Sequence, residues 1–223
     1  MSGPTGGGID NPSPDLPYNT MTLPAGTKLH RIHNDRWGPA TFNPGALIDP
    51  TNGNTGSRFA PFQSGGQFVP TLYAGDSLGV AAFETVFHDI NPAEPFKTVS
   101  MSQLSALHYS VVTLIADIEV TRLFEPDLKK LTLTRRELID CPASEYVRTR
   151  TWSKAIYESP FNLCGMTWTS RHFDEGRAYM LFGPPRLSSR LQITSSISIV
   201  NDAGTLEAVR KLGELAGVTV VHS

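Results

Sequence analysis

The order of apolar and polar positions after residue 27 is typical of short strands separated by turns, with amphipathic helices between some of them. The predicted strands are Lys28–His33, Lys97–Ser100, Leu107–Ile118, Gly165–Ser170, Ala178–Phe182, Leu191–Val200 and Gly217–Val221. The predicted helices are one that opens after the turn at Gly75–Ser77, then Thr132–Asp140, Ser144–Glu158 and Thr205–Ala216. Because strands outnumber helices and do not alternate strictly with them, the pattern predicts an α+β fold rather than a doubly wound parallel sheet.

The beginning of the chain lacks this pattern. Residues 1–24 are rich in Gly, Pro, Ser and Asn, which predicts a flexible leader. Residues 25–223 are long enough for one sizeable core and are predicted to form a single domain. Within it, residues 34–67 are dense in turn-forming residues and are expected to be mostly loop, and a loop of that length is usually functional or mobile.

The most informative helix is the one that follows the strand-like run ending near Tyr73. Asp76 or Ser77 can cap it, and its apolar face includes Val80 and Phe87. Glu84 lies between those two on the same face, where an unpaired carboxylate would be costly to bury. Two readings follow: a glutamate at the edge of the stripe that pairs with a structural arginine, or a carboxylate held at the mouth of a cleft.

Composition narrows the possible functions. The formal net charge of −2 gives no reason to expect direct binding of nucleic acid. The sequence has no apolar run of membrane-spanning length and no basic segment followed by an apolar one at its start, so neither a membrane span nor a signal peptide is expected. Cys141 and Cys164 are the only cysteines and show no metal-ligand spacing. We therefore expect a cytoplasmic protein without a metal.

Common nucleotide motifs are absent: the chain contains neither a P-loop pattern nor Gly-x-Gly-x-x-Gly. What remains is a dispersed set of functional side chains, namely Arg31, Arg58, Tyr73, Glu84 and Ser170. Two arginines can clamp a diphosphate, a tyrosine can stack on a flat heterocycle, and a carboxylate can stabilise an oxocarbenium-like transition state. The combination suits cleavage of an N-glycosidic bond in a dinucleotide.

The order of the segments around these residues resembles the RES domain, a family named for its Arg, Glu and Ser. The resemblance runs from about Leu29 to Phe182. Its segments are Leu29–Arg31, Gly56–Phe59, Leu72–Ser77 with Ala81–Glu84, Gly165–His172 and Met180–Phe182. The chain departs from the family pattern at Ser57 and Ala60, which replace a Gly and an Asn on either side of the Arg58-Phe59 pair.

This resemblance implies a toxin of a RES–Xre toxin–antitoxin module, with mixed or antiparallel sheets and flanking helices like those of ADP-ribosyltransferase toxins. It implies NAD⁺ as the substrate, no metal, and cleavage of the nicotinamide–ribose bond by water or phosphate. The implied partner is an Xre-family antitoxin whose C-terminal end blocks the NAD⁺ cleft.

The resemblance also assigns roles to residues. Arg31 and Arg58 would bind the pyrophosphate or the nicotinamide-ribose side, and Tyr73 would pack on the nicotinamide ring. Glu84 would orient the ribose and stabilise developing positive charge, and Ser170 would form a hydrogen bond within the same pocket. The implied catalytic residues are Arg31, Glu84 and Ser170, and the implied binding residues are Arg58, Tyr73 and Arg171.

Alternatives remain open from the sequence. A protein acceptor in place of water or phosphate would make the chain a mono-ADP-ribosyltransferase. Loss of turnover would leave a nucleotide-binding module. A third reading is an ordinary α+β domain in which Arg31 and Glu84 form a structural ion pair.

Overall fold

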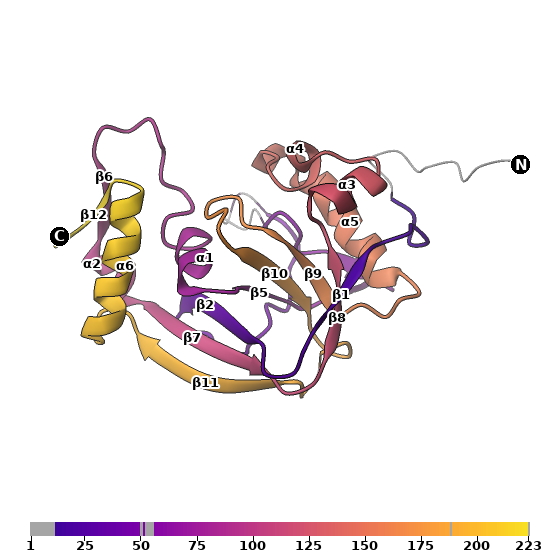
Figure 1. The fold of residues 1–223 in the computed structure, drawn as a ribbon, viewed down its shortest axis with the longest axis horizontal. Coiled ribbons are helices and arrows are strands. Elements are labelled where there is room, and N and C mark those ends of the chain that lie inside the picture. Colours follow the sequence, from indigo (N-terminus) through magenta and orange to yellow (C-terminus); the bar gives the residue numbers. More distant parts are fainter. Residues whose placement is uncertain (1–11, 50, 52–55, 188, 223) are drawn as a thin grey trace, which may run out of the picture.

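The computed structural model describes residues 12–49, 51, 56–187 and 189–222. Its centre is a curled, eight-stranded mixed sheet (Figure 1). In spatial order the strands are β1 (Thr20–Leu23), β8 (Ile118–Arg122), β9 (Gly165–Thr169), β10 (Arg177–Phe182), β5 (Thr71–Gly75), β2 (Lys28–Asn34), β7 (Leu107–Leu114) and β11 (Leu191–Ser198). Neighbouring strands are antiparallel except for β8 and β9, which are parallel.

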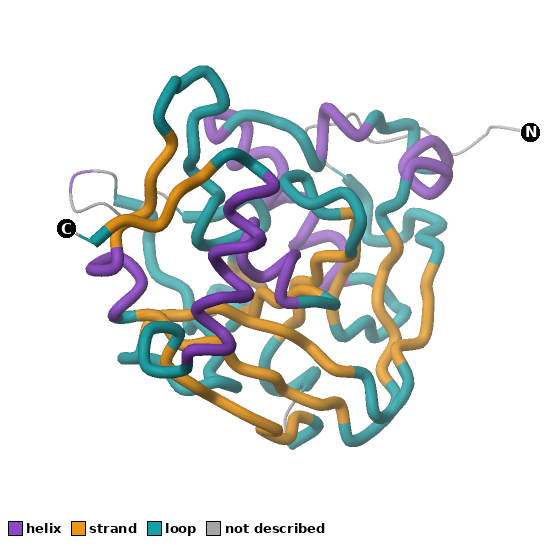
Figure 2. Tube along the Cα trace, turned by 60° about the vertical axis from the view of Figure 1, so that its left-hand side comes forward, coloured by secondary structure: helices purple, strands orange, loops and turns teal. Residues whose placement is uncertain are grey.

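Two small strand pairs and six α-helices complete the described part of the fold. The parallel pair is β6 (Lys97–Ser100) with β12 (Val218–Val221), and the hairpin is β3 (Gln63–Ser64) with β4 (Gln67–Phe68). The helices are α1 (Leu78–Phe83), α2 (Met101–Ser105), α3 (Glu125–Lys130), α4 (Arg135–Leu138), α5 (Tyr146–Glu158) and α6 (Ala203–Leu215). Helices α3, α4 and α5 cover one end of the sheet and α6 the other (Figure 1), and Figure 2 shows α6 with the β6–β12 pair beside it.

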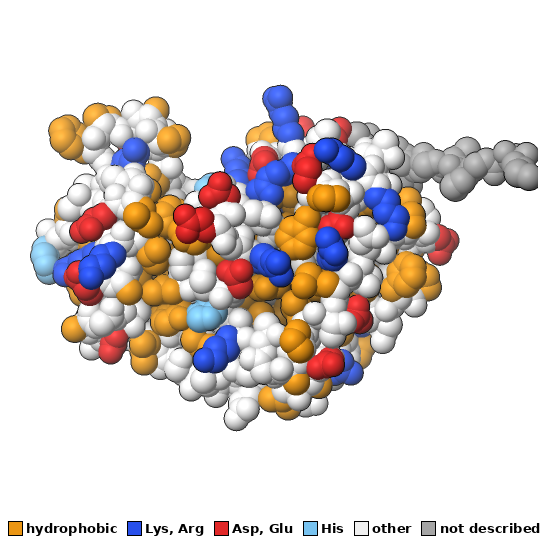
Figure 3. Space-filling view, viewed as in Figure 1, with side chains coloured by type: hydrophobic (Ala, Val, Ile, Leu, Met, Phe, Trp, Pro, Cys, Tyr) orange, Lys and Arg blue, Asp and Glu red, His pale blue; other side chains and the backbone are white. Residues whose placement is uncertain are grey.

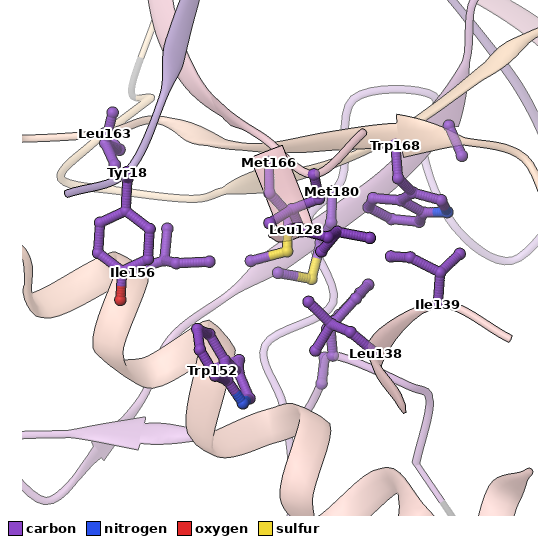
Figure 4. Packing of buried hydrophobic residues seen from close by; sticks show 14 of the residues in the cluster. Tyr18, Leu128, Leu138, Ile139, Trp152, Ile156, Leu163, Met166, Trp168 and Met180 are labelled. Atoms are coloured by element: carbon purple, nitrogen blue, oxygen red, sulfur yellow. The ribbon is translucent and has the colours of Figure 1, made fainter. Parts of the chain in front are cut away.

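At each end of the sheet, an apolar cluster packs the helices against the strands. Under α4 and α5, Trp152 and Leu138 pack with Met166, Trp168 and Met180 from β9 and β10 (Figure 4). The second cluster joins α6 to β2, α1, the segment after α1, β6, α2 and β12; its buried residues include Ile32, Ala82, Phe87, Val209 and Val218. Helix α1 contributes Val80 to the first cluster and Ala81 to Phe83 to the second. It is therefore fixed where the two clusters meet.

The predicted α+β class is confirmed, and several predicted elements have nearly their predicted bounds. The expected strand over Leu107–Ile118 is instead two strands, β7 and β8. The chain turns between them because Ile115 donates to the Arg190 carbonyl and the Asp117 carboxylate accepts from the Ala25 N–H. Periodicity did not reveal this turn, since both flanking runs are rich in β-branched residues.

The predicted leader also differs in extent. Residues 1–11 lie outside the described residues, but the end of the proposed leader belongs to the domain. Residues 20–23 form β1 and pair with β8, and the side chains of Tyr18 and Leu23 are buried. The composition of the first 24 residues suggested flexibility, whereas backbone pairing with an exposed sheet edge orders this part.

The surface carries both signs of charge. On the face in Figure 3, acidic and basic side chains are interspersed, and many of them lie over the part that holds α3 and α4. None of the helices in the described ranges combines the length and the apolar character needed to cross a membrane.

Candidate active site

Helix α1 places Glu84 at its C-terminal end. Ser77 caps the other end, where its Oγ accepts a hydrogen bond of 3.2 Å from the Val80 N–H. The sequence predicted Glu84 within the helix, whereas α1 ends at Phe83 and Glu84 is its C-cap residue; after it the N–H groups of Thr85, Val86 and Phe87 all bond to the Ala82 carbonyl. A carboxylate at a helix C-terminus gains nothing from the helix dipole. The position of the Glu84 carboxylate therefore depends on hydrogen-bond donors outside α1.

The turn before α1, Gly75-Asp76-Ser77-Leu78-Gly79, fits the Gly-x-Ser-x-Gly spacing of serine hydrolases and joins a strand to a helix. Its serine nevertheless acts as a helix cap, with extended backbone angles of φ −150° and ψ 164°. Asp76 is likewise structural, since its Oδ2 accepts the N–H of Arg177 at 2.9 Å. This turn orients α1 and does not form a nucleophile elbow.

Ser170 supplies a donor to Glu84. It follows β9, is fully buried, and its Oγ lies 2.6 Å from Glu84 Oε1. The same Oγ accepts the N–H groups of His172 at 3.3 Å and Phe173 at 3.0 Å. Glu84 Oε1 also accepts the Arg171 N–H at 3.3 Å. The turn after β9 therefore fixes the carboxylate by one oxygen.

Arg31 extends from β2 with its side chain half-buried. Its Nη1 donates to the Pro39 carbonyl and, at 3.5 Å, to the Thr41 carbonyl, which ties the guanidinium to the following loop. Burial lowers its pKa to about 10, so the side chain keeps its positive charge at neutral pH. Carbonyl oxygens orient this cation without neutralising it.

Arg58 is the more deeply buried arginine, with 6% of its surface exposed. Its guanidinium carbon lies 5.8 Å from the ring centre of Tyr146 and 6.0 Å from that of Phe59. Its Nε has no hydrogen-bond partner among the residues that the structure describes. A buried cation without a counter-charge is costly, so this position favours an anionic ligand.

Tyr73 lies in the middle of β5 and is held by its hydroxyl. The hydroxyl is 2.9 Å from Ser57 Oγ and accepts the Phe59 N–H at 3.2 Å. Burial raises its pKa to about 12, although both hydrogen bonds oppose the shift. Tyr73 therefore stays neutral and is not a base at physiological pH. Ser57, where the chain departs from the family pattern, supplies one of these two contacts.

Helix α5 fixes the segment that carries Arg58. Thr149 donates from its hydroxyl to the Arg58 carbonyl, and Arg150 Nε donates to the carbonyls of Ser57 at 3.0 Å and Ala60 at 3.2 Å. Both helix residues are buried. A loop without regular structure thus acquires a fixed backbone from a helix about 90 residues further along the chain.

These elements surround a cavity of about 340 Å³, within the usual size range of small-molecule sites. It is lined by His30, Arg31, Ile32, Gly56, Ser57, Arg58, Tyr73, Ala74, Ala81, Glu84, Thr85, His88, Tyr146, Trp168 and Ala178. Four predicted site residues, Arg31, Arg58, Tyr73 and Glu84, thus share one cavity. Ser170 acts on it through Glu84.

Arg171 is placed differently. Its side chain donates to the Cys141 carbonyl at 3.2 Å and lines a second hollow beside α4. It is not among the described residues that line the cavity, and only its backbone N–H reaches Glu84. Among the described residues, no hydrogen bond joins the Arg171 side chain to another predicted site residue.

Sequence reasoning missed several lining residues, among them His30, His88, Tyr146 and Trp168. A signal existed for His88, which is four residues after Glu84 and so falls on the same side of a helical turn. Trp168 lies in an apolar strand and resembles any core residue. Within the described ranges no group of three or more His, Cys, Asp or Glu side chains could hold a metal ion.

The partners of Arg31 and Arg58 distinguish the two interpretations of Glu84, a structural ion pair or a carboxylate at a cleft. Within the described parts of the chain, no carboxylate forms an ion pair with Arg31 or Arg58. The structural ion pair between Arg31 and Glu84 is therefore absent from these residues. Two cations and one carboxylate face the same cavity instead, an arrangement that suits a ligand with an anionic part and hydroxyl donors.

We expect Ser170→Ala to lower the free energy of unfolding by about 1–3 kcal/mol, because two partly buried N–H groups lose their acceptor and Glu84 loses a donor. Urea denaturation measures the change, with Ser102→Ala on an exposed turn of α2 as the matched control. A Ser170→Ala protein as stable as the control would show that this hydroxyl does not organise the turn.

Comparison with known proteins places this chain in a family. The comparison with curated proteins gave no match. Among solved structures, a chain in the crystal structure of the M. tuberculosis MbcT–MbcA toxin–antitoxin complex has the same fold, with a TM-score of 0.60 and 15% identity; the match covers 86% of this chain and 91% of that one. The family model described as the RES domain matches residues 28–201, most of the sequence. The chain belongs to the RES domain family.

Proposed function

We propose that the protein is the toxin of a toxin–antitoxin module and that it degrades NAD⁺ by cleaving the nicotinamide–ribose bond. The observation that carries the proposal is the meeting of Arg31, Arg58, Tyr73 and Glu84 in one cavity, with both arginines free of carboxylate partners in the described residues. Membership of the RES family and the shared fold with a chain of a toxin–antitoxin complex support it.

The roles follow from charge and position. Arg31 and Arg58 bind the diphosphate or the adjoining ribose oxygens, because guanidinium groups recognise such oxygens in pairs. Tyr73, neutral and fixed by its hydroxyl, packs against the nicotinamide ring. Glu84 uses Oε1 to bond to Ser170 and Arg171, and its Oε2 accepts from a ribose hydroxyl.

The bond that breaks joins C1′ of the ribose to the pyridinium nitrogen of nicotinamide. Its electron pair stays on that nitrogen, which becomes neutral, and positive charge develops on the ribose. The Glu84 carboxylate lies in a partly buried position where it stabilises this charge more strongly than water would. Water or inorganic phosphate then bonds to C1′.

Incubation of the purified protein with NAD⁺ tests the proposal. We expect free nicotinamide, together with ADP-ribose in phosphate-free buffer and a phosphorylated ADP-ribose when phosphate is present, each identified by mass. Release of nicotinamide with ADP-ribose attached to protein would instead indicate a mono-ADP-ribosyltransferase. Binding of NAD⁺ with no nicotinamide under any of these conditions would contradict the proposal and leave a nucleotide-binding module.

An enzyme that degrades NAD⁺ in the cytoplasm would harm its own cell unless it is inhibited. The proposal therefore includes an antitoxin of the Xre family as partner. The end of that partner would cover the cavity and exclude NAD⁺. The structural neighbour comes from a toxin–antitoxin complex, which supports a partner of this kind.

A further inference from the structure

A second titratable side chain lines the cavity one turn after Glu84. His88 lies four residues further along, and the chain between the two keeps a tight turn because Val86 and Phe87 both donate to the Ala82 carbonyl. Although α1 ends at Phe83, Glu84 and His88 both line the same cavity. Glu84 and His88 therefore both border the space that a substrate would occupy.

Asp89 contacts one ring nitrogen of this imidazole. Its Oδ1 lies 2.6 Å from His88 Nδ1. A carboxylate can only accept a hydrogen bond, so Nδ1 carries the hydrogen and Nε2 of the neutral ring is left with a free lone pair. A base whose second nitrogen is held by a carboxylate is the usual arrangement for proton abstraction in enzymes.

His172 packs against the same ring. The two imidazole centres are 4.8 Å apart with an interplanar angle of 60°. Burial lowers the pKa of His172, while the Glu84 carboxylate opposes this shift. A neutral His172 adds no positive charge beside His88, and its backbone N–H is bonded to the same Ser170 Oγ that holds Glu84. His172 is therefore a positioning residue for His88.

We propose that His88 is the catalytic base that accepts the proton of the attacking water; this assignment rests on the proposed function. The C1′–nitrogen bond breaks with its electron pair on nicotinamide, and a lone pair of the water oxygen bonds to C1′. His88 Nε2 takes one water proton and later releases it to solvent. The balance is NAD⁺ and water giving nicotinamide, ADP-ribose and one proton.

The proposed role of His88 can be measured by comparing water with inorganic phosphate as the nucleophile. Water is a poor nucleophile until it loses a proton, so hydrolysis needs the base. Inorganic phosphate already carries negative charge at neutral pH and attacks without giving up a proton. The two reactions share Arg31, Arg58 and Glu84 but differ in their need for His88.

The experiment compares wild type with His88→Ala, and with His222→Ala, an exposed histidine near the C-terminus, as the matched control. We expect His88→Ala to lower ADP-ribose formation in phosphate-free buffer by about 100-fold. Formation of the phosphorylated product at saturating phosphate stays close to the wild-type rate. Added imidazole restores part of the hydrolysis in His88→Ala and has no effect on the control.

The pH profile is a second readout. The charged or titratable side chains around His88 include Glu84, Asp89 and His172, and the cavity wall adds His30, Arg31, Arg58, Tyr73 and Tyr146. The pH dependence of hydrolysis in His88→Ala is expected to differ from that of wild type, whereas His222→Ala keeps the wild-type profile.

Two outcomes would overturn the assignment: equal losses of hydrolysis and phosphorolysis in His88→Ala, or unchanged hydrolysis with an unchanged pH profile. Both differ from failure of the proposed function, in which wild type itself releases no nicotinamide. A His88→Gln variant guards against misfolding, because glutamine keeps a polar side chain of similar length but cannot accept the proton.

Discussion

Replacing Glu84 by glutamine lowers the rate of nicotinamide release by about 10³-fold, the scale expected when a preorganised charge is removed from the transition state. The glutamine amide oxygen can still accept from Ser170 and from the Arg171 N–H. The fold and the cavity are therefore preserved while the negative charge that stabilises the ribosyl cation is lost. Steady-state release of nicotinamide, measured with and without phosphate, gives the change.

The control is Glu214→Gln, an exposed carboxylate on α6 that should leave the rate unchanged. Thermal unfolding of both variants separates chemistry from folding. A fully active Glu84→Gln enzyme would remove the proposed role of the carboxylate. A large loss of stability with little loss of activity would instead make Glu84 a structural residue.

Trp168→Ala is expected to produce the largest loss of stability, about 3–5 kcal/mol, because a fully buried indole leaves a cavity that its neighbours cannot fill. The ring lies edge-on to Phe59, with centres 5.0 Å apart, and to Tyr73, with centres 6.4 Å apart. Both neighbours position the Arg58 segment. Urea denaturation should show the loss, and NAD⁺ cleavage should fall with it because the cavity wall collapses.

Trp168→Phe distinguishes the contribution of aromatic packing to stability from that of the indole nitrogen. The Trp168 Nε1 has no hydrogen-bond partner among the described residues, so phenylalanine gives up no hydrogen bond and keeps the edge-on contact with Phe59. We expect it to retain most of the stability that Trp168→Ala loses. If alanine and phenylalanine were equally harmless, the aromatic cluster would not support the site.

The sequence by itself determined the class of the fold and most of the candidate chemistry. Periodicity located strands such as Lys97–Ser100 with their observed bounds and the long helix α5 to within two residues. These are local signals, because the alternation of burial along a strand and the apolar face of a helix both follow from the spacing of nearby residues in the sequence. The resemblance to the RES domain, carried by residues in several ordered segments, is confirmed by the family match.

Only the tertiary structure decided how those residues meet. No local pattern could predict that Thr149 and Arg150 hold the Arg58 segment, or that Ser170 reaches Glu84 across 86 positions. Side-chain hydrogen bonds across such distances depend on how β9, α1 and α5 pack, which is set by the shared core. The same packing turned the Arg171 side chain away from the cavity and brought His88 and His172 together, because a residue's neighbours in space are fixed by the whole fold and not by its place in the chain.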